Sequence, residues 1–510
     1  MHALIDSGPF APCPAPFNMA AYVLAAGQTT PDKIALQILS LTGAERWSFG
    51  ALIRAVRGVG TGLLAQGLAP GDRVLLRLAN TVDFPLAFLG AIAVGLVPVP
   101  TSSQLTAPEI TAMAAQIDPA AVIAAEGVAR PDLPVPVIEV ATLASWRDLS
   151  PCDWHRGDPD RLGYLIFTSG TSGRPRAVMH AHRAVWARRM MWAGWYGLTP
   201  EDRLLHAGAF NWTYTLGTGL MDPWAIGASA LIPAAGIAPM QLPLLLKRFD
   251  ATIFAAAPGV YRQMLKAPIL PMPRLRHGLS AGEKLPEATR QAWRAATGTP
   301  VFEALGMSEV STYVSSSPDR PAPEGASGYA QPGRRVAVLG DDAQPVARGE
   351  AGILAVADTD PGVFLGYWGQ PQETAARKRN GWFLTGDTVC MDDDGAIRYL
   401  GRDDDMMNAG GYRVSPLEVE RAFDTLPGIA ECAAVELPVR DGVSVIGLFL
   451  VASGPVPGDD TLQAHAQATL ARYKQPRLYI PVAELPKGAN NKLDRKTLRQ
   501  GWRGLNGDQA

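Results

Sequence analysis

The sequence predicts an α/β protein with a large first domain of several parts and a small α+β domain at its C-terminal end. Buried-type strands alternate with helix-length segments from about residue 34 to 280, an order typical of parallel sheets covered by helices. From about residue 332 the strands become short and alternating, which predicts a different kind of sheet. At 510 residues the chain is too long for one ordinary domain.

The elements of the first domain follow one another in a regular order. Residues 34–60 are expected to form a strand, a turn and an amphipathic helix that begins near Ser48. A buried-type strand at 72–78, a helix at 84–94 and a strand at 97–100 continue the alternation. The remaining short apolar runs lie near residues 120–125, 135–140, 204, 230–232, 251–255 and 275–280.

The last part of the first domain, residues 332–400, has short strands separated by Gly and Pro turns and predicts a small antiparallel sheet or β-barrel. A boundary falls within 401–411, so we expect domains at residues 1–403 and 404–510.

The second domain opens with Ser415-Pro-Leu-Glu418, a capping box with proline at the first helical position, so a helix is expected to run to about Thr425. Strands near 431–437 and 444–452 and a helix near 460–472 complete the predicted module.

Composition limits the classes of function. Hydrophobic residues make up 47% of the chain and charged residues 18%, so a sizeable core is expected. A net charge of −2 argues against general nucleic-acid binding. Four scattered cysteines without a Cys-x-x-Cys pair indicate neither a zinc site nor a disulfide framework. Without a signal-peptide pattern or the roughly 20 apolar residues that span a bilayer, we expect a cytoplasmic protein.

The most informative segment is an apolar strand that runs into a loop rich in hydroxyls and glycines. The loop residues are Thr168, Ser169, Gly170, Thr171, Ser172 and Gly173, and the basic residues Arg174 and Arg176 follow them. Backbone N–H groups and hydroxyls at a strand end form a concave anion site, and glycine lets the backbone approach phosphate oxygens. The Walker pattern Gly-x-x-x-x-Gly-Lys-Ser/Thr is absent. Alone, this segment is best interpreted as a polar turn.

Five further segments follow at intervals. Residues 280–284 come after a strand and can form one wall of a nucleotide site. Glu309 stands behind a Gly-x-Ser turn, an arrangement suited to Mg²⁺ beside phosphate. Asp387 is expected at a strand end with an exposed carboxylate, and Arg402 near the domain boundary. The last segment is a basic loop that contains Lys492.

Each of these segments has an ordinary structural interpretation. Thr-Gly-Asp is more often a turn than a ligand, and the basic residues near the C-terminus, Arg495 among them, are typical of a solvated face. The order and spacing of all six segments together is improbable by chance.

Taken together, the six segments resemble the adenylate-forming superfamily, which contains acyl- and aryl-CoA synthetases, the adenylation domains of peptide synthetases and firefly luciferase. The resemblance covers about residues 15–500. The segments most similar to benzoate-type and medium-chain CoA ligases are Phe17-Asn-Met-Ala, Tyr214-Thr-Leu-Gly and Gly401-Arg-Asp-Asp-Asp-Met-Met. The resemblance implies an AMP-binding domain at residues 1–403 and a mobile lid domain at 404–510, with the hinge at Asp404.

The resemblance also implies two half-reactions and the cofactors ATP, Mg²⁺ and CoA. A carboxylate attacks the α-phosphate of ATP to give an acyl-adenylate and pyrophosphate, and the CoA thiol then displaces AMP to give a thioester. The first step requires stabilisation of charge on a five-coordinate phosphorus, which cations and N–H donors supply.

The nucleotide contacts are carried over residue by residue. The residues that the resemblance places on the β- and γ-phosphates are Thr168, Ser169, Gly170, Thr171, Ser172 and Gly173, with Arg176 supplying charge behind them. Ser308 would hold the α-phosphate and Glu309 Mg²⁺. The residues that would line the adenine are Gly282, Glu283, Ala304, Leu305, Gly306 and Met307. Asp387 and Arg402 would bind the ribose hydroxyls.

Lys492 is the residue expected to drive adenylation, because it would neutralise the α-phosphate and the attacking carboxylate as they meet. Rotation about Asp404 would withdraw Lys492 and bring Gly410 and Gly411 to a thiol tunnel, where the absence of side chains lets pantetheine pass. The phosphate loop departs from the family pattern, since Pro175-Arg176-Ala177 replaces Pro-Lys-Gly, and we expect altered loop mobility and retained activity.

The resemblance places the acid pocket in the segment 206–214, around Phe210, Trp212, Thr213 and Tyr214, and the three aromatic rings of this set suit a planar ring or a short alkyl chain. For any one of them, packing in the core is an equally good interpretation. No cation is placed for a second carboxylate and no acidic residue for an α-amino group, which favours a simple monocarboxylic acid.

Other classes of protein fit less well. The glycines of 58–62 lie inside a helical pattern and do not form a dinucleotide loop. Gly278-Leu-Ser-Ala-Gly282 matches a nucleophile elbow, but the residues after it do not start a helix. The main alternative is an adenylation enzyme that loads an acyl carrier protein in trans, and a non-catalytic nucleotide-binding regulator is a third. The sequence does not distinguish a monomer from a homodimer.

Overall fold

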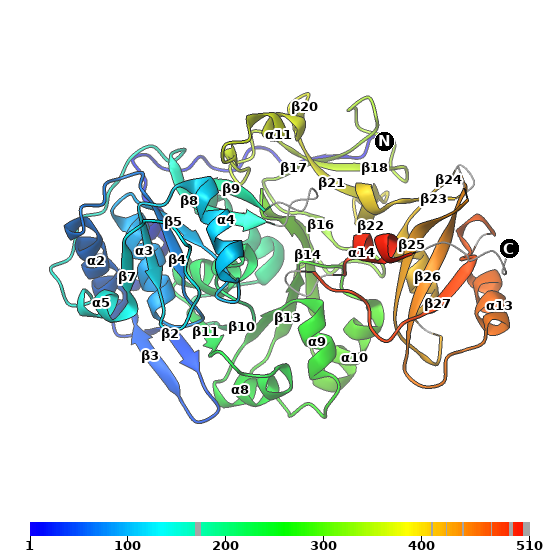
Figure 1. Cartoon of the computed structure of the whole chain (residues 1–510), viewed down its shortest axis with the longest axis horizontal. Coiled ribbons are helices and arrows are strands. Elements are labelled where there is room, and N and C mark those ends of the chain that lie inside the picture. Colours follow the sequence, from blue (N-terminus) through cyan, green and yellow to red (C-terminus); the bar gives the residue numbers. More distant parts are fainter. Residues whose placement is uncertain are drawn as a thin grey trace.

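The computed structural model describes residues 1–168, 175–409, 412–424, 426–440, 443–470, 472–488 and 493–502. The described chain forms a large domain of several sheets and a small domain, which lies at the right of Figure 1. The predicted α/β class is confirmed.

The largest sheet has nine strands, in the order β16-β15-β14-β13-β12-β10-β11-β2-β3. Its strands are β2 (Ile34–Leu39), β3 (Ala44–Ser48), β10 (Arg203–His206), β11 (Ser229–Pro233), β12 (Ile253–Ala256), β13 (His277–Ala281), β14 (Val301–Met307), β15 (Ser311–Ser315) and β16 (Tyr329–Ala330). The ladders from β2 to β14 are parallel, so the carboxyl ends of β10, β12, β13 and β14 lie along one edge. Every residue of β11, β12 and β13 is buried, as expected for parallel strands covered on both faces.

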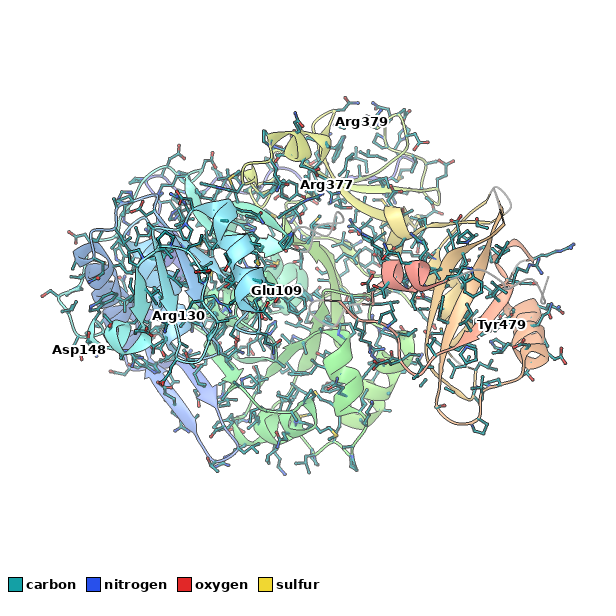
Figure 2. All side chains as sticks on the ribbon, in the orientation of Figure 1. Glu109, Arg130, Asp148, Arg377, Arg379 and Tyr479 are labelled. Atoms are coloured by element: carbon teal, nitrogen blue, oxygen red, sulfur yellow. The ribbon has the colours of Figure 1, made fainter. Side chains whose placement is uncertain are left out.

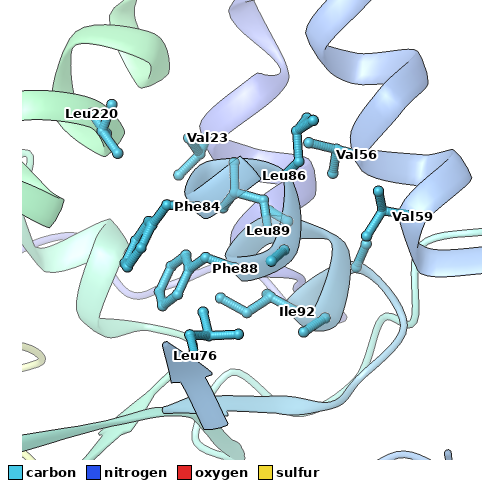
Figure 3. Close-up of a cluster of buried hydrophobic side chains, with 14 of the residues drawn as sticks. Val23, Val56, Val59, Leu76, Phe84, Leu86, Phe88, Leu89, Ile92 and Leu220 are labelled. Atoms are coloured by element: carbon cyan, nitrogen blue, oxygen red, sulfur yellow. The ribbon is translucent and has the colours of Figure 1, made fainter. Parts of the chain in front are cut away.

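A second, parallel sheet has the order β5-β4-β6-β7. Its strands are β4 (Arg73–Arg77), β5 (Val97–Pro100), β6 (Ala121–Ala124) and β7 (Val137–Glu139). Helix α3 (Asp83–Ala93) packs beside it, and α2 (Phe49–Ala65) packs against α3. Ser48 caps α2 by accepting the N–H of Ala51, at the helix start that the sequence predicts. Figure 3 shows Phe84, Phe88 and Ile92 of α3 in the main core, between α2 and β4.

The glycines of 58–62 lie inside α2, which confirms that they form no dinucleotide loop. A Cβ atom on Gly62 would lie 2.2 Å from the indole of Trp146, so these glycines allow close packing of the helix.

Two antiparallel sheets complete the large domain. β8 (Leu162–Thr168), β9 (Arg176–Ala181) and β19 (Gly366–Tyr367) form one of them. The other has an open order, β1-β17-β18-β21-β20, with β22 paired to β21. Its strands are β1 (Leu4–Asp6), β17 (Arg335–Leu339), β18 (Ala351–Ala357), β20 (Lys378–Arg379), β21 (Trp382–Met391) and β22 (Ile397–Arg402). This is the antiparallel sheet predicted for residues 332–400, with the N-terminal strand β1 added to it.

The other helices of the large domain connect and cover these sheets. They are α1 (Met19–Leu24), α4 (Ala107–Ile117), α5 (Val140–Ser145), α6 (Ala184–Ala187), α7 (Asp222–Ile226), α8 (Leu242–Arg248), α9 (Pro258–Met264), α10 (Glu287–Thr297) and α11 (Pro371–Ala376). A π-helical segment, η3 (Thr215–Met221), leads into α7. Charged side chains such as Glu109, which completes the capping box of α4, and Arg379 lie at the surface (Figure 2).

The small domain matches the predicted α+β module. It consists of β23 (Met407–Ala409), β24 (Tyr412–Val414), α12 (Pro416–Phe423), β25 (Ile429–Arg440), β26 (Val443–Ala452), α13 (Asp459–Thr469), β27 (Leu478–Pro481) and α14 (Arg495–Gly501). Ser415 accepts the N–H of Glu418 and caps α12, and the domain has its own apolar core around Val419, Phe423 and Leu448.

Candidate active site

Several of the predicted segments meet at the carboxyl-end edge of the large sheet. Thr168 ends β8 and stands opposite Arg176, the first residue of β9, in an antiparallel ladder. The phosphate-loop residues Ser169, Gly170, Thr171, Ser172 and Gly173 lie outside the described residues. Their phosphate contacts therefore stay a prediction.

Arg176 holds two protein groups. Its guanidinium lies 2.9 Å from the carboxylate of Glu373 on α11, and 5.4 Å from the centre of the Tyr367 ring. A planar guanidinium can pair with a carboxylate and stack on an aromatic face at once, which a lysine ammonium cannot do in the same geometry. The residue that departs from the family pattern therefore ties β9 to the segment that contains β19 and α11.

Tyr367 also connects this segment to Glu309. The Tyr367 hydroxyl donates a hydrogen bond of 2.7 Å to Oε1 of Glu309, and the Glu309 side chain is buried. Burial, together with the charge of Glu309, raises the pKa of Tyr367 to about 12, so the phenol keeps the proton that it donates. One buried carboxylate beside a proposed phosphate site fits Mg²⁺, which proteins usually hold through one or two carboxylates and the phosphates of a substrate.

The strand β14 carries Ala304, Leu305, Gly306 and Met307 to the same edge. A Cβ atom on Gly306 would lie 2.5 Å from the backbone oxygen of Ser311, so no side chain fits at this position. Just beyond the strand, the hydroxyls of Ser308 and Thr213 lie 3.5 Å apart. This contact brings the predicted acid-pocket segment next to the predicted α-phosphate residue.

Gly282 follows β13 with a positive φ of 98°, a conformation that glycine adopts without strain. A Cβ atom here would lie 3.1 Å from the indole ring of Trp212. Trp212 therefore packs against the backbone of the segment predicted to line the adenine.

Asp387 and Arg402 face each other on β21 and β22. Arg402 donates to Asp387 over 3.0 Å, and the hydroxyl of Tyr313 donates to the other carboxylate oxygen over 2.9 Å. The sequence prediction of an exposed carboxylate at a strand end is wrong, because β21 continues through Thr385-Gly-Asp387 and pairs with neighbours on both sides, which buries Asp387.

A cavity of about 110 Å³ opens at the ends of β10, β12 and β13. The residues that line it are His206, Ala207, Gly208, Trp212, Ala257, Gly259, Val260 and Glu283. Most of the lining residues are small and apolar. Trp212 contributes an indole ring to the lining, and Glu283 contributes a carboxylate. Trp212 and Glu283 thus place the cavity beside the proposed nucleotide site.

The other predicted acid-pocket residues have different surroundings. Phe210 packs in the main core, with its ring 5.0 Å from that of Phe84. Tyr214 is also buried, and its hydroxyl donates to the backbone oxygen of Leu279 over 3.1 Å. In the described chain, Trp212 is therefore the only member of the predicted set of four that lines the cavity.

Two cations that are largely, but not fully, buried have structural partners. Lys284 donates to Glu303 over 2.9 Å and to Ser327 over 3.0 Å, and burial lowers the pKa of Lys284 despite the attraction of Glu303. Arg495 donates to Glu420 over 2.6 Å and is mostly buried. The interpretation of Arg495 as part of a solvated face is therefore wrong, since α14 packs this side chain against α12 and β25.

The remaining predicted residues belong to the small domain and the hinge. Lys492, Gly410 and Gly411 lie outside the described residues, so their roles stay predictions. Asp404 is in the short 3₁₀ turn Asp403–Asp405 that follows β22, and its side chain is outside the described part.

Three residues that touch the site were not predicted from the sequence: Tyr313, Tyr367 and His206. Tyr367 and Glu309 are 58 residues apart, and Tyr313 and Asp387 are 74 apart, so no local spacing indicates either contact. His206 was within the segment assigned to the acid pocket, but an apolar strand end gives no signal for an unpaired imidazole.

Two searches of the described residues limit the site further. No helix among them is long and apolar enough to cross a membrane. No group of three or more His, Cys, Asp or Glu side chains within the described ranges could hold a metal ion by itself.

The layered fold and the edge on which these motifs meet are those of an adenylate-forming enzyme. Residues 24–368 match the AMP-binding enzyme family and residues 418–492 match the AMP-binding enzyme C-terminal domain. The chain therefore belongs to the AMP-binding enzyme family.

Individual relatives identify the branch of this family. The chain is 31% identical to the benzoate–CoA ligase of Thauera aromatica, over 94% of this chain and 92% of the relative. It is 29% identical to human acyl-coenzyme A synthetase ACSM2A, over 95% of this chain and 91% of the relative. The crystal structure of ATP-bound MatB from Rhodopseudomonas palustris is similar, with 26% identity, a TM-score of 0.86 and coverage of 95% of this chain and 99% of that one. The protein is an acid–thiol ligase of the AMP-forming acid–CoA ligase family, and the predicted resemblance is confirmed.

Proposed function

We propose that this enzyme activates a small aromatic or a short- to medium-chain monocarboxylic acid as its adenylate and transfers the acyl group to CoA. The observation that carries the proposal is the cavity of about 110 Å³, which is lined by Glu283 and by Trp212, whose ring packs against Gly282. An apolar cavity of about 150 Å³ is enough to bind benzene, so a cavity of this order suits one ring or a short alkyl chain.

Positions at the edge of the sheet support the proposed roles. Thr213 joins the acid-pocket segment to Ser308, which we assign to the α-phosphate. An acid in the cavity would therefore have its carboxylate near the phosphorus that it attacks, and such positioning is a large part of catalysis. Lys492 would neutralise the two anions as they meet.

Glu309 and Tyr367 would prepare the site for the nucleotide. Mg²⁺, when bound, would draw charge from the phosphates and orient them. The carboxylate of Glu309 is held by the Tyr367 hydroxyl, so it keeps its direction without a bound ion. Asp387 and Arg402 would hold the ribose, and the Ala304–Met307 strand with Gly282 would enclose the adenine.

For the second half-reaction we propose free CoA as the acceptor, with the small domain turning about Asp404 to bring Gly410 and Gly411 to the thiol path. Basic residues at 472–477 would suit the phosphates of CoA. An acidic acyl carrier protein would suit them equally, and it remains the alternative acceptor.

A panel of carboxylic acids tests the proposal. Acid-dependent exchange between ATP and pyrophosphate is expected with aromatic or short-chain acids, followed by thioester formation with CoA. If no acid in a broad panel supports exchange, the result would favour a nucleotide-binding regulator and overturn the proposal. If exchange occurs but thioester forms only with a carrier protein, the acceptor is the carrier protein and not CoA.

The role of Lys492 is tested separately with Lys492→Ala. We expect loss of exchange while a supplied acyl-adenylate is still converted to thioester. Equal loss in both half-reactions would contradict a role specific to adenylation.

A further inference from the structure

His206, the last residue of β10, has an unusual environment for a buried histidine. Its side chain is fully buried, it is one of the residues that line the cavity, and neither ring nitrogen has a hydrogen-bond partner. The ring of Tyr214 packs edge-on against it, with centroids 4.4 Å apart. The imidazole ring of His206 is therefore held in place by packing, and both of its nitrogen atoms are available to bond a ligand.

Two other buried histidines of the described chain bond through their rings, while His180, whose Nε2 also lacks a partner, is not among the residues that line the cavity. His182 accepts the backbone N–H of Met19 through Nδ1 over 3.0 Å, and His277 bonds the backbone oxygen of Tyr196 through Nε2 over 2.8 Å. A buried polar group without a partner costs about 1–3 kcal/mol. An apolar residue at position 206 would avoid that cost, so the unpaired imidazole calls for a partner that is not part of the chain.

A second unpaired group lies beside His206. Thr215, at the start of the π-helical segment η3, has a buried hydroxyl without a partner. Both side chains border Gly208, since a Cβ atom there would lie 2.2 Å from the Thr215 hydroxyl and 3.1 Å from Nδ1 of His206. Gly208 itself lines the cavity, so two unpaired polar groups adjoin one part of an otherwise largely apolar lining.

The charge state of His206 defines what it can bind. Burial, with a smaller effect of Arg188, lowers the pKa of His206 to about 3, so the ring is neutral at ordinary pH. A neutral imidazole has one N–H donor and one acceptor nitrogen. Arg188 does not offer a charge to a ligand, because it is paired with Asp222 over 2.6 Å. The environment therefore fits a neutral hydroxyl or amino group and not a second carboxylate.

We propose that His206 is a specificity-determining residue that hydrogen-bonds a hydroxyl or amino substituent on the ring of an aromatic acid bound in the cavity. The inference rests on the proposed function, because it takes the cavity to be the acid site. The unpaired Thr215 hydroxyl gives the same part of the site a second polar group. The enzyme is then selective for a substituted ring at one position.

Kinetics with matched acids test this inference. Benzoate and its monohydroxy and monoamino derivatives are compared by ATP–pyrophosphate exchange in the wild-type enzyme and in His206→Phe, which keeps an aromatic ring and removes both nitrogens. Because a bond to an otherwise unpaired buried group is worth about 1–3 kcal/mol, we expect the wild type to prefer one substituted isomer to benzoate by about tenfold or more. His206→Phe should lose that preference, because its kcat/KM should fall more for the substituted isomer than for benzoate.

Two further variants complete the test. His180→Phe makes the same change at a buried histidine that stacks on Tyr164, and it should keep the wild-type preference. His206→Asn retains a donor and an acceptor and should keep part of the preference, even if His206→Phe does not fold.

The outcomes separate this inference from the function on which it rests. Exchange with benzoate or aliphatic acids but with no preference for a substituted ring, or an equal loss for benzoate and its derivatives in His206→Phe, would overturn the role of His206 alone. Absence of exchange with every acid would overturn the proposed function as well.

Discussion

The guanidinium of Arg402 and the carboxylate of Asp387 form a hydrogen bond of 3.0 Å between directly opposed residues of β21 and β22. The hydroxyl of Tyr313 reaches the same carboxylate from β15, a strand of another sheet. The proposed ribose site is therefore fixed from two sheets at once.

Asp387→Asn should weaken nucleotide binding. A hydrogen bond to a charged group contributes about 1.5–3 kcal/mol, so we expect the KM for ATP to rise by about tenfold or more while the KM for the acid changes little. Tyr313→Phe removes only the supporting hydroxyl and should have a smaller effect in the same direction. Initial rates with each substrate varied in turn measure both, and a larger effect on the acid than on ATP would contradict the ribose assignment.

Tyr367→Phe should impair the part of the site around Glu309. The change removes one hydroxyl and keeps the ring under Arg176, so the lost interaction is the 2.7 Å bond to the carboxylate. We expect exchange to fall by about tenfold and the Mg²⁺ concentration required for binding of ATP, measured by calorimetry, to change. Tyr329→Phe is the control, because it removes a hydroxyl that donates to Asp394. Equal effects of the two variants would show that the contact with Glu309 has no special role.

Arg176→Lys tests whether the arginine acts on the protein or on the phosphates. A lysine cannot both pair with Glu373 and stack on Tyr367, so we expect a loss of up to about 1 kcal/mol of stability and exchange within about threefold of the wild type. In a double-mutant cycle, Glu373→Gln should remove most of the difference in stability between arginine and lysine at position 176. A large rise in the KM for ATP at unchanged thermal stability would instead make Arg176 a phosphate ligand.

Gly306→Ala should destabilise the protein, because the new methyl group would meet the backbone oxygen of Ser311 at 2.5 Å. Overpacking of this kind costs about 1–3 kcal/mol. Gly43→Ala is the matched control, since a Cβ atom there has no neighbour within 4 Å. Thermal denaturation of the two variants provides the comparison, and equal Tm values would contradict the close approach at Gly306.

Stability should decrease in mild acid because several histidines are buried in the neutral form. Burial lowers the pKa of His180, His182 and His206 to about 3 and that of His277 to about 4. In the unfolded chain a histidine titrates near about pH 6.5, so below that pH the unfolded state binds more protons than the folded state. The contribution to stability is complete above about pH 6.5 and is lost as the pH falls toward about 3.

The expected result is a Tm that is nearly constant above about pH 7 and falls steeply below about pH 6.5. His180→Phe removes one of these groups and should make the slope shallower. A Tm that does not change between about pH 7 and pH 5 would contradict neutral burial of the histidines.

The sequence predicted well those features that depend on neighbouring residues. Ser415 caps α12 as expected, and Ser48 caps α2 where that helix was expected to begin, because capping involves a side chain and a backbone N–H only three residues away. Glu309, Asp387 and Arg402 could be named as candidates because they stand in short, ordered segments, and their roles stay predictions.

Contacts between distant segments were not predicted. Burial of Asp387 depends on β22 and β15, and burial of Arg495 depends on Glu420, 75 residues earlier in the chain. An aromatic segment such as 210–214 shows which rings are present, but only the packing of η3 and α3 decides that Trp212 lines the cavity while Phe210 enters the core.

The ladder between β21 and β22 also offers a way to divide the protein. β22 pairs with β21 as far as Arg402. A polypeptide that ends after Arg402 therefore keeps both Arg402 and its partner Asp387 in the large domain. The small domain, with its own core, could then be produced as a separate polypeptide and added back. The turn at 403–405 would become a junction at which the small domains of related ligases can be exchanged, so that the contribution of each domain is measured separately.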